Sequence, residues 1–464
     1  MLEIYNTLTR EKDNFEPRED GKIQMFVCGP TVYDYSHIGH ARTYIAFDVI
    51  AKYLKYKYPD REVFYLQNIT DIEDKIIARA KESGRRAADV AEEFTKAYFE
   101  DMENIGVDSV TEYAPATKYI KEIVSQVKRL QEKGYVYFIE GDGYYFDLSK
   151  DPDYGKLSGR TTESAEDAVT RIDESVKKRN KGDFALWKLS TGDEPGWETE
   201  LGYGRPGWHI EDTAITEKYF GRQYDLHGGA RDLLFPHHEA EIAQMESITG
   251  VKPFVKYWMH TGFLTINGQK MSKSLGNFIT IRDILKKYSK EALRFLMLSN
   301  HYRTPIDYSD ESMKAAEAAI QRINEFKNKL ALKTDKTLHK SKAIEDTAEE
   351  TKKEFGNAMD DDFNTAKALA ALFDFMNVFN KTFADKVNGE DMLTAKHLLD
   401  IYKTMFGIVP QDTNHYDEIQ EIVNQREIAR KQKDFETADK LRDQIKSLGY
   451  EIEDTAYGPL VKKI

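Results

Sequence analysis

Hydrophobic positions near the start of the chain predict the beginning of a parallel sheet. Apolar residues alternate between residues 23 and 28, as in a β-strand, and from about residue 40 they recur at steps of four, as in a helix. A second apolar run covers residues 63–66. Strand, helix and strand in this order predict the start of a parallel α/β sheet, whose ligands bind beyond the carboxyl ends of the strands. Cys28 and Thr70 follow the two strands, so we expect a site there.

The remaining pattern divides the chain into further parts. We expect residues 1–308 to form one domain with an insertion at about 112–204, where a helix precedes short aromatic strands. The sheet pattern is expected to resume near Trp208. Beyond it, apolar stripes at helical spacing predict an α-helical bundle over 309–410, and a helical pair with a short tail occupies 411–464.

Composition narrows the class of protein only a little. The 464 residues suggest about three domains, and 40% hydrophobic with 32% charged residues is an ordinary globular balance. The net charge of −13 argues against a uniformly basic protein but allows a local nucleic-acid-binding patch. Cys28 is the only cysteine, which excludes an internal disulfide. The sequence shows neither a bilayer-length apolar run nor a secretory signal, so we expect a cytoplasmic protein that binds no membrane.

The stretch HIGH at 37–40 places two imidazole side chains and a glycine at the start of the predicted helix. His40 lies where backbone N–H groups and the helix dipole favour phosphate, and Gly39 allows a close approach because it has no Cβ. His37 adds a second imidazole beside them. The alternative is that both histidines are ordinary surface residues.

A second stretch, KMSKS at 270–274, follows a hairpin predicted by Asn267-Gly268 and places Lys270 and Lys273 in a loop. Imidazoles and ammonium groups directed at one point suit a nucleotide triphosphate whose charge is redistributed during a reaction. The alternative is that the lysines only decorate a loop. Together, and in this order, the two stretches resemble the HIGH and KMSKS signatures of class I aminoacyl-tRNA synthetases.

The resemblance extends along nearly the whole chain and narrows to the cysteinyl-tRNA synthetases. It is carried by CGPTVYD at 28–34, DFALWK at 183–188, GRPGWHIE at 204–211, HGG at 227–229, FPHHE at 235–239, KSLGNF at 273–278 and DDFNT at 361–365. It implies that ATP with Mg²⁺ activates L-cysteine as cysteinyl-adenylate, and that cysteine then passes to the terminal adenosine of tRNA(Cys). It also implies that residues 1–308 are a Rossmann-type catalytic domain with a connective insertion and, at about 268–308, a loop and stem-contact region. An α-helical bundle and a small C-terminal anticodon-binding domain would follow. We expect a monomer.

The same resemblance assigns roles to individual residues. Those expected to stabilise the transition state of activation are His37, His40, Lys270 and Lys273. Those expected to bind ATP are Gly39, His227, Gly228, Gly229 and Lys273. Those expected around the amino acid are Cys28, Gly29, Thr70 and Trp208. For Trp208 the alternative is ordinary core packing, and for His227 it is a hydrogen-bonded turn.

A metal site is expected because cysteine and serine differ little in shape, whereas thiolate is a far better zinc ligand than hydroxyl. The resemblance implies a zinc ion, Zn²⁺, held by two cysteines, a histidine and a glutamate. Cys28, His237 and Glu241 match three of these positions, and the spacing of four puts His237 and Glu241 on one helix face. The fourth position is Asp212, where the family has cysteine.

This departure leaves three possibilities open. The zinc ion is held by Cys28, Asp212, His237 and Glu241, because a carboxylate oxygen also ligates zinc and carries the same charge as a thiolate. Alternatively, water or another group replaces the fourth ligand. In the third case no metal binds tightly, and Cys28 is a small buried residue.

The C-terminal helical pair mixes charge with apolar spacing. Its basic residues available for phosphate are Arg430, Lys431, Lys433, Lys440 and Arg442. Acidic residues are interleaved with them, so only the resemblance favours anticodon binding over a solvated charged hairpin. Two alternatives remain for the whole chain: a ligase that delivers activated cysteine to a small amine, and a non-catalytic tRNA-binding remnant of a synthetase.

Overall fold

The computed structural model describes residues 1–18, 21–160, 177–271, 275–332, 340–383, 387–411, 414–455 and 458–463. The chain forms two compact units. The first contains Met1–Lys286, His301–Asp307 and Asp360–Phe363, and the second contains Lys287–Asn300, Tyr308–Met359 and Asn364–Ile464. Among the described residues, no helix combines the length and the apolar character needed to cross a bilayer.

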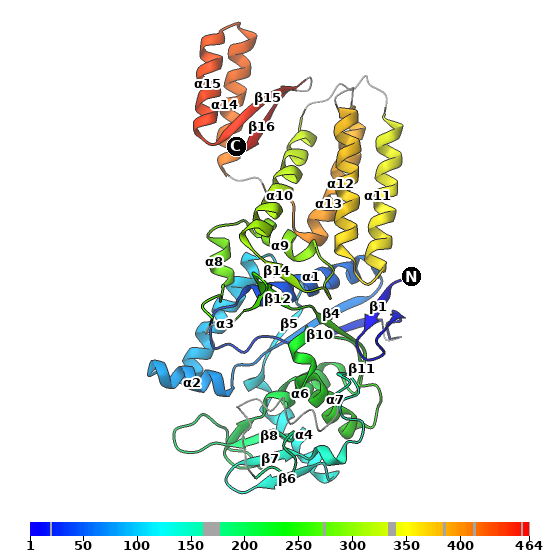
Figure 1. Cartoon of the computed structure of the whole chain (residues 1–464), viewed down its shortest axis with the longest axis vertical. Coiled ribbons are helices and arrows are strands. Elements are labelled where there is room, and N and C mark those ends of the chain that lie inside the picture. The colour runs from blue at the N-terminus through cyan, green and yellow to red at the C-terminus, as the bar shows by residue number, and fades with distance from the viewer. Residues whose placement is uncertain are drawn as a thin grey trace. The chain divides into compact units, whose positions relative to one another are not determined.

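A parallel sheet of five strands organises the first unit (Figure 1), with the order β11-β10-β3-β4-β5. The strands are β3 (Lys22–Val27), β4 (Glu62–Ile69), β5 (Glu112–Pro115), β10 (Tyr224–Ala230) and β11 (Val255–Thr261). Five of the six residues of β3 are buried, which fits a strand covered on both faces. The expected strands at 23–28 and 63–66 are confirmed as β3 and β4.

The order of the strands reverses next to β3. From β3 the chain proceeds outward to β4 and β5, and it returns much later to place β10 on the opposite side of β3. The point between β3 and β10 is therefore the topological switch point, where open α/β sheets bind their ligands. Figure 1 shows α1 (Ile38–Lys57) on one face of the sheet, with α6 (Trp208–Phe220) and α7 (His237–Thr249) on the other.

Smaller elements complete the first unit. They are β1 (Glu3–Asn6), β2 (Glu11–Asn14), α2 (Asp74–Ser83), α3 (Ala87–Asn104), α4 (Ile120–Glu132), β6 (Val136–Ile139), β7 (Gly143–Phe146), β8 (Phe184–Leu189), β9 (Gly204–Pro206), β12 (Leu264–Ile266), β13 (Gln269–Lys270) and α8 (Ile281–Leu285). Strands β6 to β9 form an antiparallel sheet within the expected insertion. Phe146 and Trp187 of this sheet belong to the same apolar core as Phe26 of β3, whereas Tyr137 and Tyr145 form a separate cluster.

The predicted hairpin is present between β12 and β13. Asn267 and Gly268 both have positive φ, 48° and 75°, as the two central residues of a tight turn require. The Asp307 carboxylate supports this turn, because it accepts hydrogen bonds from the Gly268 N–H and the Thr265 hydroxyl, both at 2.7 Å.

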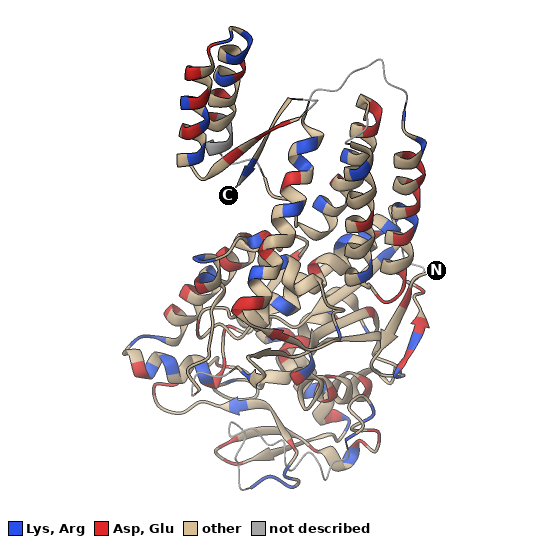
Figure 2. Ribbon diagram, turned by 45° about the horizontal axis from the view of Figure 1, so that its top comes forward, with Lys and Arg blue, Asp and Glu red and all other residues tan. Residues whose placement is uncertain are grey.

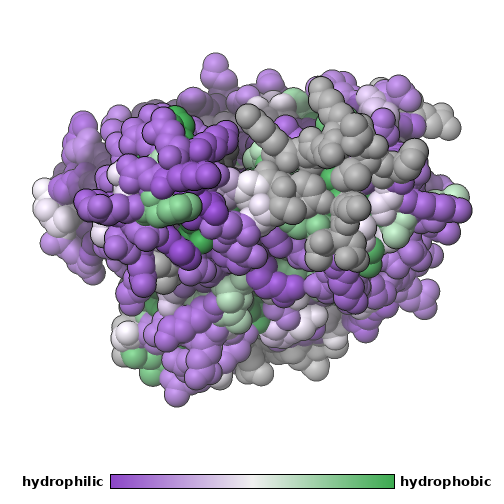
Figure 3. Space-filling view, turned by 90° about the horizontal axis from the view of Figure 1, so that it is seen from above, coloured by the Kyte–Doolittle hydropathy of each residue, from purple (hydrophilic) through white to green (hydrophobic). Residues whose placement is uncertain are grey.

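Helices dominate the second unit. They are α9 (Lys290–Leu298), α10 (Asp310–Leu330), α11 (Lys342–Asp360), α12 (Thr365–Phe383), α13 (Gly389–Phe406), α14 (Asn414–Lys431) and α15 (Phe435–Ser447). Gly407 ends α13 with φ 62°. Charged residues of both signs are interspersed along these helices (Figure 2), and the face drawn in Figure 3 is mostly hydrophilic, with apolar residues scattered over its described part.

One expectation about secondary structure is wrong, and one element was not predicted. The sheet pattern does not resume near Trp208: this residue begins α6, and β10 follows only at Tyr224. Helix α6 is buried on nearly all sides, so its sequence lacks the one-sided apolar stripe that identifies a surface helix. The short tail at the C-terminus is also a hairpin, in which β15 (Tyr450–Thr455) pairs with β16 (Gly458–Lys463).

Candidate active site

Two histidines build a reciprocal cap at the start of α1. The ring Nδ1 of His37 accepts hydrogen bonds from the N–H groups of Gly39 (3.1 Å) and His40 (3.3 Å), and the Nδ1 of His40 accepts from the N–H of His37 (3.3 Å). The two rings stack with their centroids 3.9 Å apart. Because each Nδ1 accepts, each neutral ring carries its proton on Nε2, where it can donate to a ligand.

Gly39 is required by this cap. A Cβ on Gly39 would lie 2.8 Å from Cε1 of the His37 ring, so any other residue would displace the capping histidine. The glycine therefore serves the protein's own cap, in addition to any approach of a ligand.

The expectation that backbone N–H groups of this helix start are available to phosphate is wrong. The N–H of Ile38 donates to the Ile279 carbonyl at 3.1 Å, and the next two N–H groups donate to His37. A phosphate at this helix start would meet imidazole N–H groups instead. Burial lowers the pKa of His40, and the neighbouring His37 lowers it further, so His40 is neutral at pH 7.

Main-chain hydrogen bonds tie this helix start to the segment that follows the KMSKS stretch. The Ile281 N–H donates to the Ser36 carbonyl at 2.9 Å, and His37 forms an isolated bridge with Thr280. The ring of Phe278 meets the His37 ring edge to face, with centroids 5.3 Å apart. Main-chain hydrogen bonds therefore hold the first signature stretch next to the segment that follows the second, although the two stretches are more than two hundred residues apart.

Lys270 lies exposed at the end of β13, and its carbonyl accepts a hydrogen bond from the Asn277 side chain at 3.2 Å. The predicted loop thus leaves the hairpin at Lys270. Lys273 lies outside the described residues, so its role stays a prediction.

A buried set of metal-binding side chains lies beside the switch point. It consists of Cys28 after β3, Asp212 on α6, and His237 and Glu241 on α7. One ligand atom of each lies within 4.8 Å of those of the others, and all four residues are at most 4% exposed. Nε2 of His237 lies 3.0 Å from an oxygen of Asp212 and 2.9 Å from one of Glu241. The four residues expected as zinc ligands thus lie together, and that they bind zinc stays a prediction.

A second donor set overlaps the first. Nε2 of His227 and of His238 lie 3.3 and 3.1 Å from the Cys28 sulfur, and with Glu241 they form another group of four ligand atoms within 4.8 Å. His238 was not among the donors expected from the sequence. Further histidines support both sets. The Nδ1 of His209 lies 2.7 Å from Nδ1 of His237, and the Nδ1 of His238 lies 2.8 Å from Nε2 of His260.

The cluster carries excess negative charge for a buried site. Burial, followed by the charges of Glu241 and Asp212, raises the pKa of the Cys28 thiol well above its usual range. Burial raises the pKa of Glu241 to about 7, with His237 opposing the shift. For His237, burial lowers the pKa, but Glu241 and Asp212 outweigh it and raise the pKa to about 9. Two carboxylates and a thiol around a single imidazolium leave a net negative charge, which a further cation would neutralise.

Asp212 is held by a residue that sequence reasoning missed. Its Oδ1 accepts a hydrogen bond from the Asn68 side chain of β4 at 2.5 Å, while its Oδ2 faces His237. The same Asn68 reaches the Thr70 hydroxyl at 3.3 Å, and that hydroxyl donates to Glu211 at 2.6 Å. Asn68 and Thr70 are two residues apart on β4 and its extension, so they face the same side.

The residues expected around the amino acid lie near this cluster. Gly29 passes so close to β4 that a Cβ would lie 1.7 Å from the Asn68 carbonyl oxygen. Thr70 is buried, whereas Trp208 is only partly buried and stacks on the His237 ring with centroids 4.4 Å apart. Trp208 is therefore not an ordinary fully buried core residue.

Three residues of β10 were expected to bind ATP, and they lie in the interior of the protein. His227 is fully buried, stacks on Trp258 (4.2 Å) and has its Nδ1 2.6 Å from the Tyr224 hydroxyl. A Cβ on Gly228 or Gly229 would lie 2.4 Å from the Phe47 ring or 2.8 Å from the His238 ring, so both positions exclude larger residues. The structure places His227 among the metal-binding donors, and its contact with ATP stays a prediction.

One side chain connects the two halves of the site. The Tyr44 hydroxyl donates to the Cys28 carbonyl at 3.3 Å, and the Tyr44 ring stacks near the His40 ring with centroids 6.0 Å apart. The donor cluster and the histidine cap thus lie at the same carboxyl edge of the parallel sheet. A parallel sheet with this pair of signatures at its switch point defines the class I aminoacyl-tRNA synthetases.

Comparison with known proteins agrees. The family model "tRNA synthetases class I (C) catalytic domain" matches residues 14–318, and a DALR domain matches residues 354–410. The chain is 45% identical to the cysteine–tRNA ligase of Thermococcus onnurineus, covering 100% of this chain and 99% of the relative, and 43% identical to that of Carboxydothermus hydrogenoformans, covering 100% of both. The chain belongs to the cysteine–tRNA ligase family.

Solved structures show the same fold at low sequence identity. A methionyl-tRNA synthetase of Mycobacterium tuberculosis in complex with methionyl-adenylate superimposes with a TM-score of 0.62 at 16% identity, covering 83% of this chain and 92% of that one. The leucyl-tRNA synthetase agnB2 of Agrobacterium radiobacter K84, in a ternary complex, gives a TM-score of 0.61 at 11% identity, covering 85% of each chain.

Proposed function

We propose that the protein activates L-cysteine with ATP and transfers it to the terminal adenosine of tRNA(Cys). The observation that carries this proposal is the donor cluster around Cys28, which lies at the same sheet edge as the His37–His40 cap. A thiol-recognising site beside a polyphosphate-binding site is what cysteine activation requires. The relatives matched over their full length are named cysteine–tRNA ligases, which supports this reaction over delivery to a small amine or a non-catalytic role.

The residues that would hold zinc are Cys28, Asp212, His237 and Glu241. They fit such an ion: the four ligand atoms are of the preferred types and lie within 4.8 Å of one another. His237 to Asp212, His237 to Glu241 and Cys28 to Glu241 measure 3.0, 2.9 and 3.9 Å, close to the separation of ligands about 2.0–2.3 Å from a common centre. The burial of two carboxyl groups, those of Asp212 and Glu241, in one cluster is a second argument for fit. When bound, the ion supplies a cation to which a substrate thiolate binds far better than a hydroxyl. Asp212 makes this set richer in oxygen than the family pattern.

On the phosphate side, His37 and His40 would donate hydrogen bonds from Nε2 to the nucleotide as the carboxylate of cysteine attacks the α-phosphorus. The bond from phosphorus to pyrophosphate breaks as the new bond forms, and Lys270 and Lys273 would balance the charge that the leaving group gains. Mg²⁺ would accompany the phosphates. A general base is unnecessary, because the attacking carboxylate is already ionised at pH 7.

The remaining site residues would position the two substrates. We assign Gly29, Thr70 and Trp208 to the wall around cysteine, because they adjoin the donor cluster. We assign Gly39, Gly228 and Gly229 to close packing at the ATP side. The buried His227 would support this side from the interior of the protein. The monomeric state and the cytoplasmic location stay predictions.

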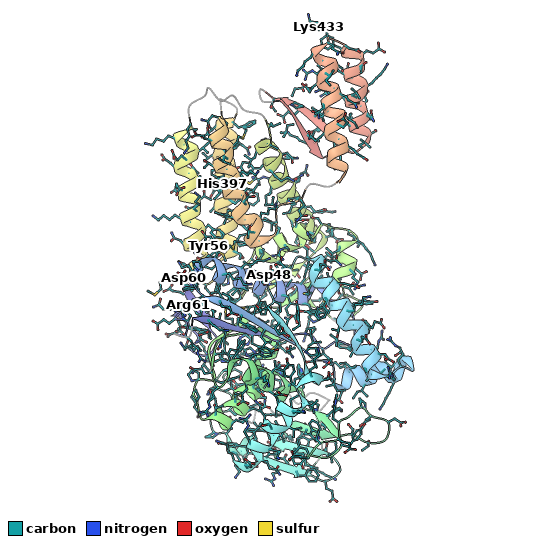
Figure 4. The ribbon with its side chains drawn as sticks, turned by 180° about the vertical axis from the view of Figure 1, so that it is seen from behind. Asp48, Tyr56, Asp60, Arg61, His397 and Lys433 are labelled. Atoms are coloured by element: carbon teal, nitrogen blue, oxygen red, sulfur yellow. The ribbon has the colours of Figure 1, made fainter. Side chains whose placement is uncertain are left out.

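The C-terminal region would contact the anticodon end of tRNA. Of its basic residues, Arg430 pairs with Asp454 and Lys440 with Glu436, whereas Lys433 lies exposed at the turn between α14 and α15 (Figure 4). Removing residues 411–464 should reduce aminoacylation much more than ATP–pyrophosphate exchange. Equal loss of both activities would contradict this assignment.

The central test is ATP–pyrophosphate exchange with cysteine and with serine, in the presence and absence of a zinc chelator. We expect exchange with cysteine only, and its loss after chelation. Failure of the metal-supplied enzyme to exchange pyrophosphate with cysteine would overturn the proposed function.

A further inference from the structure

Glu211 is a buried carboxylate that the proposed reaction has not yet used. It is 1% exposed and precedes Asp212 on the first turns of α6. Its Oε1 accepts a hydrogen bond from the Thr70 hydroxyl at 2.6 Å. Its Oε2 is also buried but has no hydrogen-bond partner among the described residues. An unsatisfied buried carboxylate oxygen costs free energy, so a ligand that completes it is expected.

The surroundings of Glu211 are acidic. Its nearest charged neighbours are the carboxylates of Asp212, Asp71 and Glu73. Arg205 and Lys188 belong to neighbouring strands of the insertion, but both pair with Asp74. A positively charged group is therefore the partner that Oε2 of Glu211 lacks among the described residues.

The neighbouring carboxylates already have partners. Asp71 accepts from the N–H and the hydroxyl of Thr117, at 2.9 and 2.6 Å. Glu73 caps α2 by accepting from the Lys75 N–H at 2.7 Å. Glu211 is thus the member of this group whose buried oxygen is available.

Glu211 lies where the ammonium group of a cysteine bound through its thiol is expected. Asn68 and Thr70, on one side of β4 and its extension, hold Asp212 and Glu211 respectively. The two carboxylates are therefore side by side, one in the thiol-recognising cluster and one next to it. In cysteine the thiol and the ammonium group are separated only by Cβ and Cα, so a thiol bound at the cluster places its ammonium nearby.

We propose that Glu211 binds the α-ammonium group of the amino-acid substrate through Oε2, and that Thr70 orients this carboxylate. This inference rests on the proposed function, because it takes the thiol end of cysteine to lie at the Cys28 cluster. Glu211 thereby selects an amino acid over a simple thiol acid. It also fixes the side of the substrate from which the carboxylate approaches ATP.

The test compares L-cysteine with 3-mercaptopropionate, which keeps the thiol and the carboxylate but lacks the amine. Dissociation constants are measured by calorimetry on metal-loaded wild-type protein and on Glu211→Gln. Wild type should prefer cysteine about 10- to 100-fold, the value of a buried charge-assisted hydrogen bond. Glu211→Gln should lose most of this preference by weakening cysteine alone, with its metal content unchanged.

A matched control is Glu239→Gln. Glu239 is also a buried glutamate, but its oxygens accept from the N–H groups of Gly155 (3.0 Å) and Ser158 (2.5 Å). Its substitution should leave the preference between the two ligands unchanged.

Three outcomes would overturn the inference. These are a wild-type preference below about threefold, which needs no variant to fold, a preference that survives in Glu211→Gln, and equal weakening of both ligands. Failure of the proposed function is recognised separately, because wild-type enzyme would then show no cysteine-dependent exchange.

Discussion

The two halves of the active site are built on opposite principles. On the amino-acid side, Cys28, Asp212, His237 and Glu241 are buried, and each lies against another before any substrate arrives. On the phosphate side, His37 and His40 are only partly buried, and Lys270 is exposed. Selection of cysteine therefore depends on a preorganised cluster with fixed charge, whereas binding of the nucleotide brings exposed groups together around a charge that develops during the reaction.

The largest effect is expected when the sulfur atom of Cys28 is removed from the preorganised cluster. In Cys28→Ser, we expect metal content to fall from about one equivalent to below about one tenth, and cysteine-dependent exchange to fall at least about 1000-fold, because a hydroxyl is a poor zinc ligand. Metal analysis and exchange assays measure the two effects. A variant that keeps a full equivalent of metal and normal exchange would contradict the assignment of this cluster.

The phosphate side should respond differently. Lys270→Ala removes a charge that matters in the transition state, so we expect kcat for exchange to fall about 100- to 1000-fold while the dissociation constant for cysteine changes less than about twofold. The exposed Lys287 offers a matched control, and Lys287→Ala should leave both values unchanged. Loss of cysteine binding in Lys270→Ala would show that the two halves are not separable.

The same contrast explains what the sequence could predict. Cys28 follows a strand whose alternation is clear, and His237 and Glu241 are four residues apart on one helix, so local rules place these three side chains on their elements. That they are metal ligands was expected from the family resemblance. The fourth, Asp212, was found only because a family motif marks its position. The local chemistry of a carboxylate in a buried helix does not distinguish a ligand from a structural residue.

Other features were beyond sequence reasoning because they arise only in the folded chain. Asn68 reaches Asp212 from another strand, and His238 and His260 meet across α7 and β11. Helix α6 is buried all round, so its periodicity does not reveal it. The capping role of His37 was also missed, since histidine is not among the residues that usually begin helices.

The departure at Asp212 provides a milder way to sharpen the comparison. Asp212→Cys restores a second sulfur donor, and we expect zinc affinity to rise about tenfold, because thiolate is the softer ligand. Competition with a chromophoric chelator measures this affinity. Exchange activity should change little, since the wild-type cluster already selects the thiol. Unchanged affinity in Asp212→Cys would indicate that the residue at this position does not reach the ion.

The smallest effect concerns the histidines that support the cluster. Burial lowers the pKa of His260 to about 3, whereas an unfolded histidine titrates near 6.5. The unfolded chain therefore binds a proton between these values that the folded chain does not, so this residue contributes stability above pH 6.5 that is lost as the pH falls towards 3.

Urea unfolding of chelator-treated protein at pH 6.5 and 5.5 tests this contribution. We expect the loss of unfolding free energy between the two pH values to be smaller by about 1 kcal/mol in His260→Asn than in wild type. His397, exposed on α13 (Figure 4), supplies the matched variant His397→Gln, which should keep the wild-type loss. If both variants show the same pH dependence, the buried histidines are not held neutral, and the amino-acid side is less rigidly preorganised than its geometry indicates.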